Sequence, residues 1–484
     1  MQKSIVGILS VFLILAAYLQ LPDLYQYDSK RILQLLVLFA IGLILLISIS
    51  KNIISNRYLA SKKLPKLNLF SICVIVLFIA GAISVVMASN FRYALLEFSF
   101  LFLLFSLLII LAPSNLRQHY FLGKMIFGTA IVFSGLYIVI FFGNYISSFF
   151  NPMIALWPEK YNFALTINGV ELIGREVLYF DNVRFFNHIQ TWTLPILVGF
   201  LTYIQKKNYD LLSRGILFLL ICCWWMLILA TTGRGSFFGI IVSLITITII
   251  WRKEVYKFVS NSFLSLSVGG LLYYLLFILP VDTIGQTILR IESSRPYRFL
   301  GALEVWWQNP FFGLGPMHYA QIGESQFVGH PHNFYLQFLS EWGIFAFLAL
   351  LAIIIIGMLF VYKNYYKTLG QSNNRIIYIT LTWSLCAGLI HAFFSGVIMT
   401  PLSQIWLVLI IAWFYGYKKR RKENTSGVII RFNFVSIFYL VFLISTLWAV
   451  YYDIFNLIEM YSEYASNYPG RKFYPRFWVQ GLFD

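Results

Sequence analysis

The chain has 484 residues, of which 60% are hydrophobic and 11% charged, and its mean hydropathy is +0.77. Because soluble domains carry about 25% charged residues, this composition excludes a soluble protein and leaves room for roughly a dozen membrane-spanning helices. The net charge of +17 would indicate a nucleic-acid-binding protein in a soluble chain, so it is tested first as a sign of membrane topology.

Apolar runs, separated by charged breaks or breaks that contain Pro, Gly or Asn, predict an all-α polytopic membrane protein with about 12–13 transmembrane helices. The predicted helices cover about residues 4–20, 32–50, 68–88, 94–113, 125–147, 191–205, 215–230, 237–251, 258–280, 341–362, 377–394, 399–417 and 432–451. No small-x-small cleavage site follows the first run, so we interpret it as a retained helix and not as a signal peptide. Residues 1–451 thus form one multi-span domain.

Lysine and arginine are distributed unevenly over the loops. With the N-terminus in the cytoplasm, the inner side carries Lys3 and loops 51–66, 114–124, 206–214, 252–257, 363–376 and 418–431. These hold 23 of the 36 basic residues and 3 of the 19 acidic residues. Such an excess in cytoplasmic loops orients membrane helices, and it explains the net charge without nucleic acid or another anionic partner.

The predicted outer, periplasmic side carries two loops much longer than the others, 148–190 and 281–340, and a tail over residues 452–484. Loops of this length in a tightly connected protein are usually functional, so the second loop is predicted to be the catalytic one. The tail is rich in Tyr, Phe and Trp, a mixture that favours the membrane interface.

Groups capable of chemistry gather on the outer side. Of the six histidines, only His119 falls in an inner loop. Deep in the predicted spans there are almost no ionisable residues, whereas ion-coupled transporters carry such residues along their pathway. The pattern favours an enzyme of the outer face over a flippase or other lipid transporter, which remains the alternative from a different class.

The segment 183–191, which enters the sixth predicted span, is the first candidate. Its Arg184, Asn187 and His188 lie together at the top of a helix, where they could contact sugar hydroxyls or an acceptor. The alternative is that they only cap the helix and anchor it at the interface.

Arg234 is the second candidate. It lies in the sequence Thr-Thr-Gly-Arg-Gly-Ser at a tight outer turn between two apolar helices. The flanking glycines allow close approach to the backbone, so an anion could reach both the guanidinium and the amides. The alternative is an arginine that extends to the membrane interface.

Two further arginines lie in the second long loop. Residues 297–308 have the pattern of a short amphipathic helix, ended by Asn309-Pro310 and a glycine turn. Arg295 and Arg298 are three residues apart and share a face if this helix starts early. With Arg234 they would form a clamp for a diphosphate, since arginine binds phosphate oxygens through two nitrogens at once. A helix that rests on lipid headgroups is the alternative.

The sequence Gly-His330-Pro-His332-Asn333 follows. A residue before proline favours extended backbone, so His330 and His332 can project to the same side, and a helical pattern begins at Asn333. Imidazole, with an unperturbed pKa of about 6.5, is the usual general base at neutral pH. A metal site is the rival interpretation, but only His318 and Glu324 offer further ligands nearby. A structural role is the third.

These motifs resemble the O-antigen ligase superfamily of bacterial inner-membrane glycosyltransferases, which comprises O-antigen ligases, O-antigen polymerases and protein O-oligosaccharyltransferases. Residues 295–315 follow the family's Arg, aromatic, Ala-Leu, Asn-Pro, Gly-x-Gly pattern. The next family motif is His, then Asn, Ser or Gln, nine residues, Gly, two residues, and then Gly, Thr or Tyr. This chain matches it at His332, Asn333 and Gly343, and departs from it at the last position, which is Ala346. Arg234 falls where the family has an arginine in a membrane turn. The resemblance covers about residues 230–346.

The resemblance implies a GT-C-like membrane fold and transfer of a glycan from undecaprenyl diphosphate to an acceptor hydroxyl at the periplasmic face. His332 would be the catalytic base, and Arg234 and Arg295 would hold the diphosphate. Arg298 and His330 would assist, and Asn333 would contribute to acceptor binding. Family members are inverting enzymes without metal or cofactor. The absence of an Asp-x-Asp motif agrees with this, because arginines can neutralise the leaving diphosphate.

The acceptor differs among members of the superfamily. The aromatic tail suggests a docking surface for a protein acceptor such as a pilin, with transfer to Ser or Thr. Lipid A–core, the acceptor of O-antigen ligases, is the close alternative, and chain extension by a polymerase is the third.

Overall fold

The computed structural model describes residues 1–54, 68–113, 115–150, 165–167, 170–173, 179–279, 295–322, 329–365, 372–419, 425–467 and 476–479. Almost all of these residues are helical, which confirms the predicted all-α class. The exception is a small antiparallel pair of strands, β1 (Leu165–Ile167) and β2 (Val170–Ile173).

The helices match the predicted apolar runs, and most begin or end a few residues away from them. They are α1 (Gln2–Leu15), α2 (Gln26–Ile54), α3 (Leu69–Met87), α4 (Phe91–Leu111), α5 (Leu116–Phe150), α6 (Val183–Lys206), α7 (Leu211–Ala230), α8 (Arg234–Trp251), α9 (Tyr256–Tyr273), α10 (Arg295–Gln308), α11 (Tyr319–Ile322), α12 (Phe334–Tyr365), α13 (Ser372–His391), α14 (Pro401–Lys419) and α15 (Thr425–Asn467). A 3-10 turn, Arg252–Val255, precedes α9, and a π turn, Tyr274–Ile278, follows it.

Side-chain caps define several helix starts. Asn68, Asn90, Asn182 and Asp210 each accept a hydrogen bond from a backbone N–H in the first turn of α3, α4, α6 and α7, respectively. Asn and Asp are favoured at this position because the first N–H groups of a helix have no partner within the helix. The caps explain why these helices start at polar residues just before their apolar runs.

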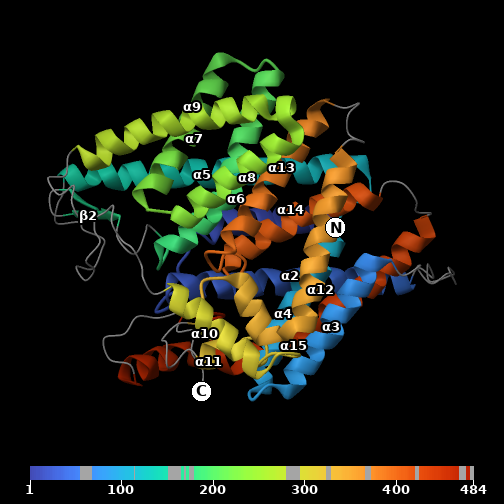
Figure 1. Ribbon diagram of the computed structural model, residues 1–484. Coiled ribbons are helices and arrows are strands. Elements are labelled where there is room, and N and C mark those ends of the chain that lie inside the picture. The colour runs from blue at the N-terminus through green and yellow to red at the C-terminus, as the bar shows by residue number, and fades with distance from the viewer. Residues whose placement is uncertain are drawn as a thin grey trace.

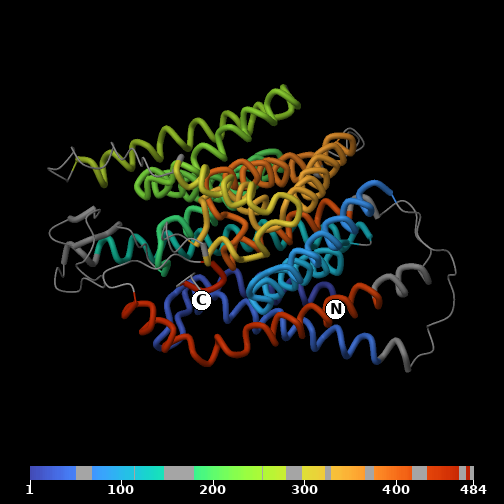
Figure 2. Tube along the Cα trace, turned by 60° about the horizontal axis from the view of Figure 1, so that its bottom comes forward, coloured from blue at the N-terminus to red at the C-terminus, as the bar shows by residue number. Residues whose placement is uncertain are grey.

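The bundle has two groups of helices (Figure 1). Helix α13 packs on α6 and α8, and α7 packs on α9, while in the other group α12 packs on α3 and α15 packs on α4 and α2. Helix α14 contacts members of both groups, including α4 and α6. Figure 2 shows the long α15 along one edge of the bundle, beside α2.

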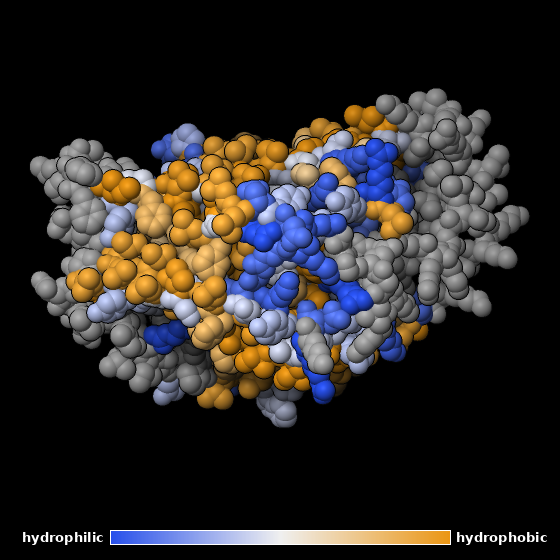
Figure 3. Space-filling view, turned by 90° about the horizontal axis from the view of Figure 1, so that it is seen from above, coloured by the Kyte–Doolittle hydropathy of each residue, from blue (hydrophilic) through white to orange (hydrophobic). Residues whose placement is uncertain are grey.

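Membrane-spanning character is evident in the described part of the chain. Nine helices there are long and apolar enough to cross a membrane, and three shorter apolar helices, α1, α13 and the first part of α14, accompany them. Helix α6 contains Pro195 and several polar residues, but it is mostly buried by other helices. The nine long and three shorter helices make twelve candidate spans in the described residues, and α6 would be the thirteenth. This agrees with the expected total of twelve or thirteen. Seen from above, hydrophobic side chains cover broad areas around a central hydrophilic patch (Figure 3).

Helix α12 is interrupted near its start. Gly343 has φ 73° and ψ 177°, which is not helical, and the loop after α10 fills the gap. Leu314 and Gly315 donate backbone hydrogen bonds to the carbonyls of Ser340 and Glu341 at 3.0 Å, and the Ile344 N–H donates to Pro310 O at 2.9 Å. The break therefore joins α12 to the segment that follows α10.

The C-terminal tail differs from the prediction. Helix α15 continues to Asn467, and Arg476, Phe477 and Trp478 are 2%, 6% and 1% exposed. We expected these aromatic side chains at the membrane interface, but the structure buries them among α2, α4 and α15, where Phe477 packs on Phe100. The expectation was wrong for these residues because polar partners inside the bundle hold the segment there.

Three ionisable groups are buried near the ends of the helices. Asp28 and Arg31 are buried in α2 and Glu341 in α12, each no more than 1% exposed. Helix α2 starts six residues before the predicted apolar run, so Asp28 and Arg31, which were assigned to a loop, lie inside the bundle. All three lie at the end that also carries residues 179–183, 231–234, 309–322, 329–333 and 392–400, which we call the outer end.

Candidate functional site

The turn Gly329–Asn333 places two histidines side by side at the outer end. The rings of His330 and His332 meet edge to face, with centroids 4.4 Å apart. His332 has φ 59°, in the left-handed region, and its N–H donates to His330 Nδ1 at 3.0 Å. Asn333 Oδ1 then accepts from the N–H groups of Tyr335 and Leu336. Asn333 is thus the N-cap of α12, and the prediction that the helix begins here is confirmed.

His330 is held in its neutral form. Burial, together with the positive charges of Arg476, Arg184 and Arg298, lowers its pKa from 6.5 to about 3. Its Nδ1 accepts a hydrogen bond, so the neutral ring carries its proton on Nε2. His330 therefore orients the backbone of His332 and is not positioned as a proton acceptor for a substrate.

Arg184, from the second position of α6, contacts the other histidine. Its Nη1 lies 3.4 Å from His332 Nε2. Arginine has only donors, so Nε2 is the acceptor in this contact. This contact connects the first candidate segment with the histidine turn.

The predicted arginine helix exists as α10. It begins at Arg295, so Arg295 and Arg298 lie in the same first turn. The side chain of Arg295 lies outside the described residues. Arg298 is half-buried, and its charge acts on both His330 and Tyr319. Arg298 therefore lies near the histidine turn.

Arg234 is the first residue of α8 and is exposed, directly after the tight turn that the sequence predicted. We expected its flanking glycines to admit a ligand, but protein side chains occupy the space beside them. A Cβ on Gly233 would lie 2.8 Å from Asn187 Nδ2, and one on Gly235 would lie 2.6 Å from His391 Nε2. The glycines allow α6 and α13 to approach the turn, and they leave the guanidinium as the exposed group.

A buried polar network surrounds this turn. Asn187 Nδ2 donates to Thr231 Oγ1 at 2.7 Å and to Gln190 Oε1 at 2.9 Å. Thr191 Oγ1 lies 2.8 Å from His391 Nδ1 and 2.9 Å from Ser236 Oγ. All of these polar residues are buried within the bundle. The network connects α6, α7, α8 and α13 and sets the position of Arg234.

His188 has a supporting position. Its Nε2 lies 2.7 Å from Ser395 Oγ and its Nδ1 3.3 Å from Thr400 Oγ1, both in the connection between α13 and α14. A Cβ on the adjacent Gly396 would lie 3.4 Å from the ring of His330. His188 is 2% exposed, so it holds the connection on which His330 rests. Contact with a sugar, which the sequence suggested for Asn187 and His188, remains a prediction.

Gly235→Ala tests the packing at the Arg234 turn. The added methyl group displaces His391, and we expect a loss of about 1–2 kcal/mol in stability, as for overpacking of a core, together with lower activity. Thermal unfolding in detergent and a transfer assay measure both effects. Gly215→Ala in α7 is the matched control, because no atom lies within 4 Å of its Cβ position. Equal behaviour of the two variants would contradict the packing argument.

His318, one of the two further ligands considered for a metal site at the histidine pair, is not available to bind a metal. His318 is fully buried; its Nε2 accepts from the Asn90 N–H at 2.9 Å, and its Nδ1 lies 2.9 Å from Pro316 O. Both ring nitrogens are engaged, so His318 is a structural residue. Glu324 lies outside the described residues. Within the described part of the chain, no group of three His, Cys, Asp or Glu residues has the arrangement of a metal site.

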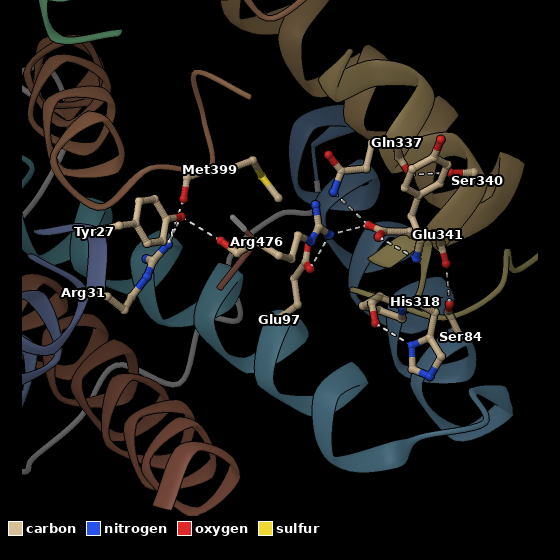
Figure 4. Close-up of polar contacts among 12 residues, drawn as sticks. Tyr27, Arg31, Ser84, Glu97, His318, Gln337, Ser340, Glu341, Met399 and Arg476 are labelled. Atoms are coloured by element: carbon tan, nitrogen blue, oxygen red, sulfur yellow. Dashed lines mark hydrogen bonds and ion pairs between the residues drawn. The ribbon is translucent and has the colours of Figure 1, made fainter. Parts of the chain in front are cut away.

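Arg476 is the residue that sequence reasoning missed. It was grouped with an interfacial tail, but its guanidinium lies between Glu97 of α4 and Glu341 of α12 (Figure 4). Burial by itself would lower the pKa of Arg476, but the two carboxylates raise it overall, so the group stays charged. No local pattern around position 476 indicates this, because the partners lie more than a hundred residues away in the sequence.

The described part of the chain is a bundle of apolar helices with arginines and histidines gathered at one end, the arrangement of a multi-pass membrane protein with a polar site. The O-antigen ligase family model matches residues 216–351, a range that contains Arg234, α10 and the segment from His332 to Gly343. This region is therefore similar to the O-antigen ligase family, and the resemblance seen in the sequence is confirmed. No curated protein matches the chain.

Proposed function

We propose that this protein transfers a glycan from a polyprenyl diphosphate, such as undecaprenyl diphosphate, to an acceptor hydroxyl at the periplasmic face of the bacterial inner membrane. The observation that carries the proposal is the contact between Arg184 and Nε2 of His332, a histidine within the region that matches the O-antigen ligase family. It supports an unprotonated imidazole in a group of arginines, which is the arrangement that this reaction needs.

The proposed chemistry follows from the residues. His332 Nε2 removes the proton of the acceptor hydroxyl as its oxygen attacks the anomeric carbon of the donor sugar. The bond from that carbon to the diphosphate oxygen breaks, and the polyprenyl diphosphate leaves with the electron pair. Arg234, Arg295 and Arg298 bind the diphosphate and stabilise its increasing charge. Attack on the face opposite the leaving group inverts the anomeric centre, and no metal is required.

We propose only that the acceptor carries a hydroxyl group, and we do not specify the molecule to which this group belongs. The preference for a protein acceptor rested on an exposed aromatic tail, and burial of Phe477 and Trp478 removes that support. Deletion of the gene, followed by comparison of glycosylated pilin, lipopolysaccharide banding and glycan chain length, distinguishes the protein, lipid A–core and polymer acceptors. An unchanged result in all three would contradict the proposal.

Purified protein in vesicles that contain a lipid-linked glycan provides the direct test. We expect loss of glycan from the lipid and its appearance on an acceptor, with the same rate in the presence of EDTA. Abolition by EDTA with rescue by a divalent cation would overturn the metal-free mechanism. Movement of the glycan lipid across the bilayer without transfer would instead support the flippase alternative.

The arginine clamp predicts that lysine cannot replace arginine. Arg234→Lys and Arg295→Lys should each lower the transfer rate at least about tenfold, since lysine is a point charge and cannot make a paired contact with phosphate oxygens. Arg375→Lys, in an exposed ion pair with Glu254, is the matched control and should keep the wild-type rate. Wild-type rates for the two site variants would contradict the clamp.

A further inference from the structure

The segment Arg476–Val479 is built into the outer end by contacts from two helices. Tyr27 Oη and Arg31 Nε of α2 donate to the carbonyls of Arg476 and Phe477 at 2.7 and 3.2 Å. The Val479 N–H donates to Asp28 Oδ1 at 2.8 Å, and Trp478 Nε1 donates to an oxygen of Asp453 at 2.9 Å. The guanidinium of Arg31 also lies 4.6 Å from the centre of the Phe477 ring. Contacts to both backbone and side chains give this segment one defined position.

Arg476 connects this segment to the base of the histidine turn. Its Nη2 is shared by the carboxylates of Glu97 and Glu341 (Figure 4). The other oxygen of Glu341 accepts the N–H of Tyr319 at 3.0 Å, and Gln337 Nε2 donates to the oxygen that Arg476 binds at 3.2 Å. Glu341 thus joins the tail to both α11 and α12.

Glu341 also lies at the break of α12. Its carbonyl accepts hydrogen bonds from the Gly315 N–H at 3.0 Å and from Ser84 Oγ at 3.1 Å. Glu341 is two residues before Gly343 and nine residues after His332, so its position determines how the loop after α10 meets the start of α12. A shift of its carboxylate would move both chain segments that flank the histidine turn.

The charge of Arg476 reaches the site as well. After burial, it is the strongest influence that lowers the pKa of His330. His330 must remain neutral to accept the N–H of His332 through Nδ1. Arg476 therefore influences the turn that carries His330 and His332 both through its contacts with Glu341 and through its charge.

We propose that Arg476 is a positioning residue of the transferase, and that the C-terminal segment Arg476–Val479 completes the active site by fixing Glu341 and the turn that carries His332. The catalytic part of this inference rests on the proposed function. The positioning part does not, because it concerns the conformation of the turn.

The first test separates positioning from simple stability. Arg476→Gln alone leaves two buried carboxylates without a counter-charge, which destabilises a protein strongly, whereas neutralising all members of a buried ion group is often tolerated. The triple variant Glu97→Gln/Glu341→Gln/Arg476→Gln should therefore recover the melting temperature in detergent. We expect its transfer rate to stay at least about tenfold below wild type, because small displacements at an active site cost this much. A triple variant with both wild-type melting temperature and wild-type rate would overturn the proposal.

The second test does not depend on transfer. His332→Cys is labelled with a membrane-impermeant maleimide, in the wild-type and the triple-variant backgrounds. The four native cysteines, Cys73, Cys222, Cys223 and Cys386, are buried. Loss of the nearby charge and of the fixed turn should change the labelling rate at least about fivefold, since thiol reactivity follows local charge and access. Arg375→Gln is the control and should leave the rate unchanged.

Equal labelling in the two backgrounds would contradict the positioning role, whatever the transfer assay gives. If the wild-type protein transfers no glycan but labelling differs, the proposed function fails while the positioning of the turn stands. The two proposals are thus tested separately.

Discussion

Replacement of His332 by asparagine is expected to lower glycan transfer by at least about 100-fold, the usual contribution of a general base. Asparagine removes the imidazole but tolerates the left-handed backbone that His332 adopts at φ 59°. The variant should therefore remain folded, with a melting temperature close to that of wild type. Initial rates with saturating lipid-linked donor measure the effect.

Two further variants complete this experiment. His332→Ala places a Cβ without a polar side chain in the left-handed region, at a cost of about 1–2 kcal/mol, so it should be both inactive and less stable than His332→Asn. His119→Asn is the control for histidine loss, because His119 packs on Trp413 near the start of α5. More than half of the wild-type rate in a folded His332→Asn protein would rule out His332 as the base.

Gly343→Ala is expected to have the second-largest effect, on assembly of the outer end. Gly343 has φ 73°, and a Cβ there would lie 2.3 Å from the carbonyl oxygen of Phe311. The carbonyl of Phe311 is part of the backbone, and the position of a Cβ at residue 343 is fixed by the backbone. Neither atom can therefore rotate away. Strain in the left-handed region together with overpacking should destabilise the protein by at least about 3 kcal/mol and separate α12 from the loop after α10.

The same helix offers a matched control for this variant. Gly357 lies in the regular part of α12 with no atom within 4 Å of its Cβ position. Gly357→Ala should leave stability unchanged or raise it by up to about 1 kcal/mol, as alanine favours a helix over glycine. Thermal unfolding in detergent compares the two. Equal melting temperatures for Gly343→Ala and Gly357→Ala would show that the break in α12 is dispensable.

The fold class could be predicted from the sequence because apolar runs of membrane length have few alternative structures. Every backbone polar group in a bilayer must be satisfied, and a helix does this locally. The runs therefore predicted the helices, and the amphipathic pattern of 297–308 predicted α10. Helix starts were less accurate because capping residues such as Asn90 and Asn182 are polar and lie outside the hydropathy signal.

The candidate site was predictable only as a set of residue types. Arginine and histidine within loops of one side indicate phosphate binding and base chemistry, and short-range spacing placed Asn333 at a helix start. Sequence spacing could not show that Arg184 reaches His332, that His391 fills the space beside Gly235, or that Gly343 faces a backbone carbonyl. Each of these contacts joins residues that are more than thirty positions apart in the sequence.

The sequence by itself determined a polytopic helical membrane protein whose chemistry lies on one side. Hydropathy and loop charge can be read from consecutive residues, without knowledge of tertiary contacts. The tertiary structure alone decided the position of the C-terminal segment. Aromatic residues and an arginine near a chain end suit a membrane interface as well as a buried site. Only the two carboxylates of Glu97 and Glu341, brought together by the packing of α4 and α12, make burial of Arg476 favourable.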